Sequence, residues 1–175
     1  MELYRSRFTS GALAVLENLK NESVDVATVQ KREPPPPPFD LAREQELRAS
    51  IKNSTNASDA YFSIMQLMLF YYKYRNLKDL YLEYCIKLCR VDIELLPKVD
   101  QEYQRLYGRR FVANLPAFDK LYAIYYKRRD YNNALLVCQE YLACPQRGNE
   151  ATQTDKIRKR ILLCQRKLSL AGEVK

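Results

Sequence analysis

Apolar residues recur at helical spacing through most of this chain. Between Leu77 and Leu96 they are three and four positions apart, which places their side chains on one face of an α-helix. The members of this face are Leu77, Leu80, Tyr84, Leu88, Val91 and Leu95. The pattern therefore predicts an amphipathic helix over 77–96.

Similar patterns predict further helices, and glycine and proline limit them. The predicted segments are 11–20, 39–51, 59–74, 98–107, 116–127, 131–143 and 155–168. Proline has no backbone N–H, so Pro97 is expected to end or kink the helix before it, or to begin the next one. Gly108 is expected to stop the helix that follows Pro97, and Pro116 to occupy a first helical position.

The same spacing predicts which residues are buried. The apolar faces comprise Leu41, Leu47 and Ile51 in 39–51, Val99, Tyr103 and Leu106 in 98–107, and Ile157, Ile161, Cys164 and Leu168 in 155–168. Within the segment 59–74, residues 61–74 are apolar over most of their surface, Phe62 included, so neighbouring helices are expected to enclose them. Tyr71 and Tyr125 are expected in the core.

The first 38 residues are expected to form an arm. Leu13, Leu16 and Leu19 give a short apolar stripe, and the five consecutive prolines at 34–38 are typical of a polyproline II rod. The rod is interpreted as a stiff spacer or, alternatively, as a ligand for SH3-like or WW-like domains. The predicted organisation is an N-terminal arm over 1–38 and a helical domain over 39–175.

The absence of histidine narrows the possible chemistry. Without His the chain cannot carry serine–histidine or cysteine–histidine catalysis or a zinc site with histidine ligands. Carboxylates such as Asp92 and Glu94 are two positions apart and point in different directions on a helix. There is no glycine-rich phosphate loop. We expect a protein that is not an enzyme and needs no cofactor.

Cysteine usage indicates a cytoplasmic protein. The chain has five cysteines, an odd number, and no secretory leader, so reduced thiols are expected. Cys85 and Cys89 have a spacing that suits two metal ligands, but no second close pair completes a site. We expect no metal and buried cysteines. No apolar stretch approaches the roughly 18 residues of a membrane span, so no membrane partner is expected.

An internal repeat indicates how the helices are arranged. The segment 71–77, YYKYRNL, matches 125–131, YYKRRDY, at four identical positions and one Asn/Asp pair, 54 residues later. Each copy falls where the first helix of a predicted hairpin turns into the second. A repeated helical hairpin is the unit of an α-solenoid.

The second copy resembles the tetratricopeptide repeat. Leu121, Tyr125, Asp130-Tyr131 and Ala134 fall at the family's spacing, and Pro145 stands one residue before its closing proline. The resemblance covers roughly Asp59 to Pro145 and extends loosely to small tetratricopeptide-like proteins of bacteria and their phages. It implies an all-α, solenoid-like stack of hairpins with a C-terminal capping helix.

The sequence also departs from the family pattern. Tyr122 and Tyr141 replace small residues, Arg129 replaces the turn glycine, and Leu80 stands where Ala134 does. The long period is attributed to an inserted helix after Pro97.

The resemblance implies a concave groove that binds a partner peptide or helix. Carrying the groove positions over gives Gln66, Leu69, Tyr72 and Lys73 from the first hairpin and Lys120, Ala123, Tyr126 and Lys127 from the second. Tyrosine and lysine suit acidic peptides with apolar side chains. We therefore expect a protein-interaction module, an adaptor, regulator or inhibitor, with an acidic or amphipathic segment of another protein as its partner.

The formal charge of +8 leaves two alternatives open. Basic residues concentrate around 105–130 and along the last helix, at Lys156, Arg158, Lys159, Arg160, Arg166 and Lys167. Such clusters bind phosphate backbones, so a nucleic-acid-associated regulator is one alternative, although the last helix also fits a simple cap. Self-assembly into a homo-oligomer through the N-terminal arm is the other.

Overall fold

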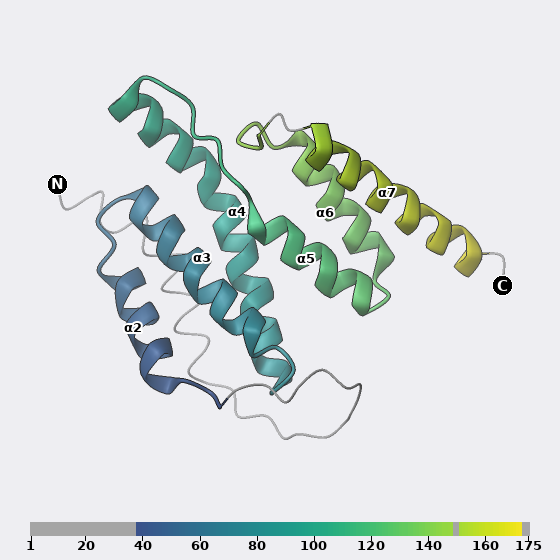
Figure 1. Ribbon diagram of the computed structural model, residues 1–175, viewed down its shortest axis with the longest axis horizontal. Coiled ribbons are helices and arrows are strands. Elements are labelled where there is room, and N and C mark those ends of the chain that lie inside the picture. Colours follow the sequence, from purple (N-terminus) through teal and green to yellow (C-terminus); the bar gives the residue numbers. More distant parts are fainter. Residues whose placement is uncertain (1–37, 149–150, 173–175) are drawn as a thin grey trace. The chain divides into compact units, whose positions relative to one another are not determined.

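The computed structural model describes residues 38–148 and 151–172, and every element it names is helical, which confirms the all-α prediction (Figure 1). The helices are α2 (Leu41–Lys52), α3 (Ala57–Lys73), α4 (Asp79–Tyr107), α5 (Pro116–Lys127), α6 (Tyr131–Ala143) and α7 (Ala151–Gly172). The chain forms two compact units, unit 1 up to Glu102 and unit 2 from Tyr103 onward. The predicted helix over 11–20 and the first four residues of the proline rod lie outside the described residues.

The helix bounds agree with the sequence patterns to within four residues, except at Pro97. Helices α5 and α6 have the predicted bounds, and α7 begins four residues earlier than predicted. The prediction that Pro97 ends one helix or begins the next is wrong, because the 29-residue helix α4 contains it. Leu96 and Val99 on either side are buried, and Pro97 itself faces solvent. Burial of these neighbours offsets the hydrogen bond that proline removes, a cost of about 3 kcal/mol.

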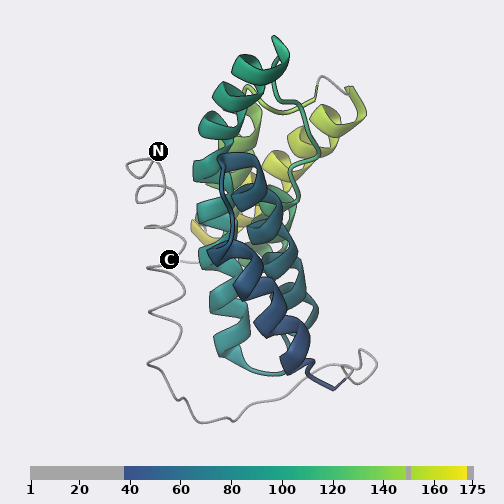
Figure 2. The ribbon, with the colours of Figure 1, turned by 90° about the vertical axis from the view of Figure 1, so that its left-hand side faces the viewer.

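Aromatic rings hold unit 1 together. In Figure 2, α2 and α3 lie side by side, and ring contacts join α3 to α4. Phe39 stacks on Tyr81 with centroids 4.6 Å apart and meets Tyr74 edge-on at 5.0 Å. The Tyr74 hydroxyl donates a hydrogen bond to the carbonyl oxygen of Pro38 at 3.3 Å. The residues that follow the proline run are therefore anchored to the unit.

A polar network joins α2 to Tyr71 in the last turn of α3. The Tyr71 hydroxyl donates to Glu44 Oε1, and Arg48 Nη2 donates to the Tyr71 hydroxyl at 2.6 Å and to Glu44 Oε1 at 2.8 Å. Tyr71 has no exposed surface, as predicted, and burial raises the pKa of its phenol. Because these hydrogen bonds connect Glu44 and Arg48 of α2 with Tyr71 of α3, the network helps to fix how α2 lies on α3.

Three residues expected in the interior, Leu41, Phe62 and Leu106, are exposed, and several others, Tyr125 among them, are only half-buried. Leu41 is exposed because it lies about a quarter turn from the Glu44, Leu47 and Ile51 face, and Phe62 because it lies opposite the buried Ile64 and Tyr71. Leu106 is exposed, as are its neighbours from 104 to 107, because the described residues leave the last turn of α4 largely in solvent. Tyr125 is only half-buried, whereas its repeat equivalent Tyr71 is fully buried.

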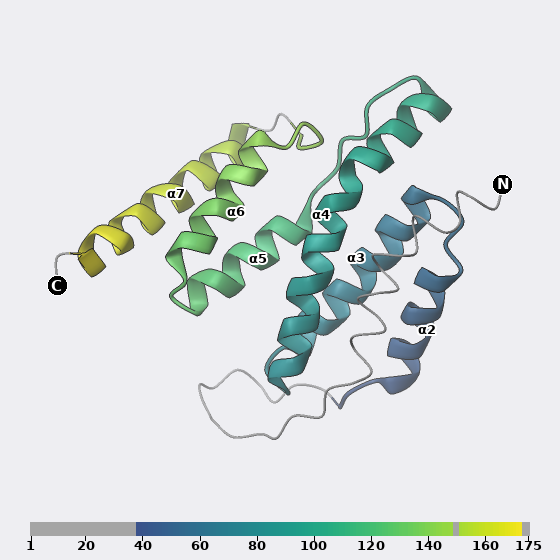
Figure 3. The same ribbon diagram turned by 180° about the vertical axis from the view of Figure 1, so that it is seen from behind.

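Unit 2 places α6 between α5 and α7. The two views of opposite sides agree on this order, and α6 packs on both neighbours (Figures 1 and 3). Ala134 on α6 is fully buried, as expected for a small residue where helices cross closely. Ile157 and Cys164 are the buried residues of α7, with Ile161 and Leu168 half-buried beside them. The predicted inner face of the last helix is therefore confirmed.

The turn from α5 to α6 contains a strained residue. The Asp130 N–H donates to the Tyr125 carbonyl at 2.9 Å and the Arg129 N–H to the Tyr126 carbonyl at 3.1 Å, the two hydrogen bonds of a Schellman turn. Arg129 has φ of 60°, a left-handed conformation that glycine adopts without cost. This is the position at which the tetratricopeptide pattern places glycine.

Arg129→Gly should therefore stabilise the protein by about 1 kcal/mol, because it removes the left-handed penalty of a residue with a Cβ. Chemical denaturation measures the change. Arg128→Gly is the matched control, since Arg128 has φ of −75° and should lose stability on substitution. Equal destabilisation by both glycines would contradict the account of this turn.

One carboxyl group in unit 1 is buried without full hydrogen bonding. Asp92 on α4 is 1% exposed, and its Oδ1 has no hydrogen-bond partner among the residues that the structure describes. Burial raises the pKa of Asp92 from 3.8 to about 8. The neutral acid is therefore the form that the folded protein accommodates at lower pH.

Stability should fall as the pH rises from about 4 to 8, because the folded state then retains a proton that the unfolded state has released. The contribution of Asp92 to this fall is on the order of a few kcal/mol. Asp92→Asn should flatten the dependence, with near-equal stability at about pH 4 and a gain that grows toward pH 8. Parallel curves for the two proteins, measured by urea denaturation at several pH values, would be the contrary result.

Candidate functional site

The predicted binding residues of the first hairpin lie along α3. Gln66, Leu69 and Lys73 are exposed, and Tyr72 is half-buried with the Arg75 guanidinium 4.3 Å from its ring centroid. Phe62 continues the same line and is also exposed, at 40%. The sequence reasoning placed Phe62 in the interior, although the spacing 62, 66, 69, 73 could have assigned it to this line.

The predicted residues of the second hairpin lie on α5. Lys127 is exposed, and Lys120 and Tyr126 are half-buried. Tyr126 stacks on Tyr122 with centroids 5.5 Å apart and meets Tyr131 edge-on at 5.4 Å. The ring of Tyr126 is therefore held by its neighbours and still keeps part of its surface in solvent.

The basic residues of α7 do not form one flank. Lys156 and Arg160 pair with Asp119 of α5, and Arg158 pairs with Asp155 one turn away. The other three, Lys159, Arg166 and Lys167, are exposed and make no ion pair within the part of the chain that the structure describes. The helix thus directs its charges to different sides.

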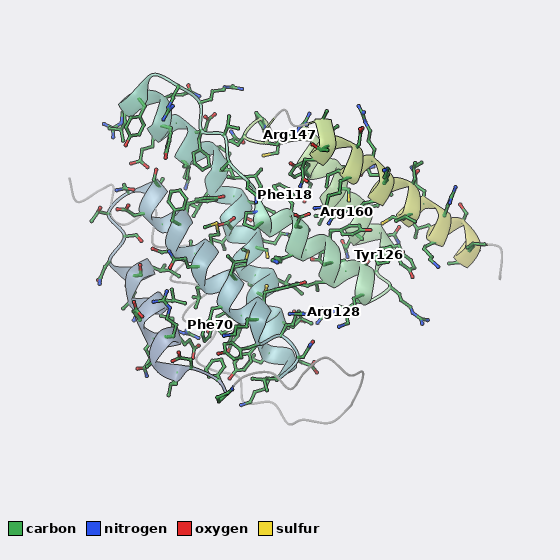
Figure 4. The ribbon with its side chains drawn as sticks, viewed as in Figure 1. Phe70, Phe118, Tyr126, Arg128, Arg147 and Arg160 are labelled. Carbon is green, nitrogen blue, oxygen red and sulfur yellow. The ribbon has the colours of Figure 1, made fainter. Side chains whose placement is uncertain are left out.

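Arg160 connects α7 to α5 at the centre of a small cluster. Its Nη1 donates to Asp119 Oδ1, and its Cζ lies 4.3 Å from the centroid of the Tyr122 ring. Lys156 Nζ adds a contact of 3.4 Å to Asp119 Oδ2. We call Asp119, Tyr122, Tyr126, Lys156 and Arg160 the α5–α7 cluster; Figure 4 labels Tyr126 and Arg160.

Burial sets the protonation of the groups beneath the cluster. It raises the pKa of Tyr122 to about 12, with Cys164 adding to the rise and Arg160 opposing it. Burial, with a further contribution from Cys164, also raises the pKa of Cys138 to about 12. Both groups are therefore neutral at physiological pH, and the thiols are in the unreactive form. The described residues contain no group of three or more side chains suited to holding a metal ion.

The cluster can attract anions through its positive charge, and its tyrosine rings add apolar surface beside that charge. Two cations face one carboxylate, so one positive charge is not balanced locally. Tyr122 was expected only as a departure from the family pattern, and Asp119 was not singled out. The steps of three and four from Asp119 to Tyr122 and Tyr126 are a signal that could have grouped them, but their partners on α7 come from tertiary packing.

The Asp119–Arg160 pair should contribute measurably to the docking of α7. Asp119→Ala leaves a largely buried guanidinium without its carboxylate, so a loss of about 1 kcal/mol is expected. Hydrogen exchange should become faster in α7 than in α2. Asp155→Ala is the matched control, because its pair with Arg158 is exposed and contributes little. Equal effects of the two substitutions would refute this role.

None of the described helices has the length and apolar composition needed to cross a bilayer. The chain matches no model of a known protein family, and neither curated proteins nor solved structures give a match.

Proposed function

We propose that this chain is a protein-interaction module with tetratricopeptide-like hairpins, and that it binds an acidic segment of a partner at the α5–α7 cluster. The proposal is supported by one observation: two partly exposed cations, Lys156 and Arg160, belong to the same cluster as Tyr126, whose ring stacks on Tyr122. Lys127, exposed at the end of α5, extends the positive charge beyond Tyr126.

Three observations support the interpretation of unit 2 as tetratricopeptide-like. The α5–α6 turn has a left-handed residue, Arg129, at the position of the family's glycine. Ala134 is fully buried at the position where the family requires a small residue. A third helix, α7, follows on the far side of α6, in the order that consecutive hairpins would give.

Acidic segments suit the cluster because of its charge and its rigidity. Arg160 is fixed by Asp119 and Tyr122, so a ligand carboxylate would meet a guanidinium that is already oriented. Such preorganisation reduces the ordering cost of binding. The half-buried ring of Tyr126 offers apolar area beside the charge, and tyrosine and arginine are enriched among residues that dominate binding energy.

The ion pairs favour a protein ligand over nucleic acid. Three of the six basic residues on α7 already pair with Asp119 or Asp155, so the helix does not present the continuous row of cations that suits an extended phosphate backbone, whereas a short acidic segment needs only the positive charge beside Tyr126. Nucleic acid remains the alternative for the exposed cations. Self-assembly through the arm involves residues outside the described part of the chain and stays a prediction.

A selection from a random peptide library should enrich acidic sequences that contain aromatic or aliphatic residues. Tyr126→Ser should weaken binding of the selected peptides about tenfold, because it removes the ring contact. Isothermal titration calorimetry measures the affinity. Tyr107→Ser is the matched control, since Tyr107 is an exposed tyrosine at the end of α4 and should bind as the wild type does.

Circular dichroism should show unchanged helicity in both variants. The proposal fails if selection yields no acidic consensus, or if both tyrosine variants bind equally well. It fails also if mixed-sequence oligonucleotides at the same ionic strength bind more tightly than any selected peptide.

A further inference from the structure

The outer side of α7 is apolar where an amphipathic surface helix is normally polar. Leu162, Leu163 and Leu170 are 59%, 44% and 58% exposed, while Ile157 and Cys164 on the opposite side are buried. A helix that packs by one stripe has no structural use for leucines on the other. Three such leucines on one helix therefore indicate a surface that something covers.

Two cations share this face with the leucines. Lys159, Leu163, Arg166 and Leu170 follow one another at steps of four, three and four, which places them in one line along the helix, with Leu162 beside Leu163. We call these five residues the outer row. Lys159 and Arg166 are exposed and carry no ion pair within the described residues, so charge and apolar surface alternate along it.

We propose that the outer row docks an acidic amphipathic helix of a partner protein. Apolar residues of that helix would cover Leu162, Leu163 and Leu170, while its carboxylates would meet Lys159 and Arg166. The alternation in the outer row requires leucine-like residues seven positions apart and an acidic residue four positions after each. This surface is separate from the α5–α7 cluster, whose residues Lys156 and Arg160 are directed toward α5.

Charge argues against a second copy of the same helix as the occupant. Two outer rows facing each other bring four cations together. Asp155, the one carboxylate within α7, is already paired with Arg158. Like charges with no counter-charge disfavour the pairing, whereas an acidic helix neutralises both cations.

The outer row also differs from a phosphate-binding surface. A nucleic-acid ligand gains affinity from the cations alone, and the three leucines would remain uncovered. An acidic helix uses both kinds of side chain. One helix docked on another buries an area at the low end of specific interfaces, so the dissociation constant should be roughly micromolar.

The probe is a synthetic alanine-based helix with leucines seven positions apart and a glutamate four positions after each. Fluorescence anisotropy of the labelled peptide measures binding to the full chain. The wild type should bind this peptide and not its lysine-for-glutamate counterpart. Leu162→Asp and Leu170→Asp should each weaken binding about tenfold, and so should the charge reversals Lys159→Glu and Arg166→Glu.

Leu136→Asp is the matched control, because Leu136 is a leucine of similar exposure, 45%, on α6. It should bind as the wild type does, and so should Tyr126→Ser, which separates this surface from the α5–α7 cluster. Unchanged circular dichroism establishes that the variants fold.

Four results would overturn the assignment. The first is no binding of the peptide by the wild type, and the second is an equal loss of affinity in Leu136→Asp. The third is a wild-type dimer in sedimentation equilibrium that Leu162→Asp dissociates. The fourth is an oligonucleotide that binds the wild type more tightly than the peptide does and does not bind Lys159→Glu.

Discussion

The contact of Arg160 with Asp119 and Tyr122 organises unit 2. Its guanidinium is planar, so it can donate to the carboxylate while its face lies over the ring. These contacts link α7 to α5, while the inner face of α7, with Ile157 and Cys164, is buried where the helix packs on α6. Because one side of α7 is committed in this way, its opposite side presents the outer row to solvent. Both proposed binding surfaces depend on this one arrangement.

Much of the helical pattern was readable from the sequence because packing and propensity agree there. Pro116 and Ala143 bound α5 and α6 as expected, since proline suits a first helical position and Pro145 soon follows the second helix. The prediction for Pro97 was wrong because burial of Leu96 and Val99 on either side of it outweighs the loss of one backbone hydrogen bond. The prediction for Phe62 was wrong because α3 is apolar on several sides. The sequence of such a helix does not show which of its apolar residues a neighbouring helix will cover.

The candidate site was predictable only in part. The resemblance to tetratricopeptide repeats identified Tyr126 and Lys127, and the charge run identified Lys156 and Arg160 as basic residues. The sequence could not show that Tyr126, Lys156 and Arg160 belong to one cluster, because the ion pair between Asp119 and Arg160 joins residues 41 positions apart. The charge run also could not show that α7 divides its cations between two sides. That division depends on which face of α7 packs on α6.

The most direct test of the account is nuclear magnetic resonance mapping of an acidic peptide selected against the full chain. Amide and side-chain resonances would be followed during titration. The account predicts that the largest shifts fall on Tyr122, Tyr126, Lys156 and Arg160, with smaller changes elsewhere. Shifts confined to α2 and α3, or spread evenly over exposed lysines and arginines, would contradict the claim that α5 and α7 together form the recognition surface.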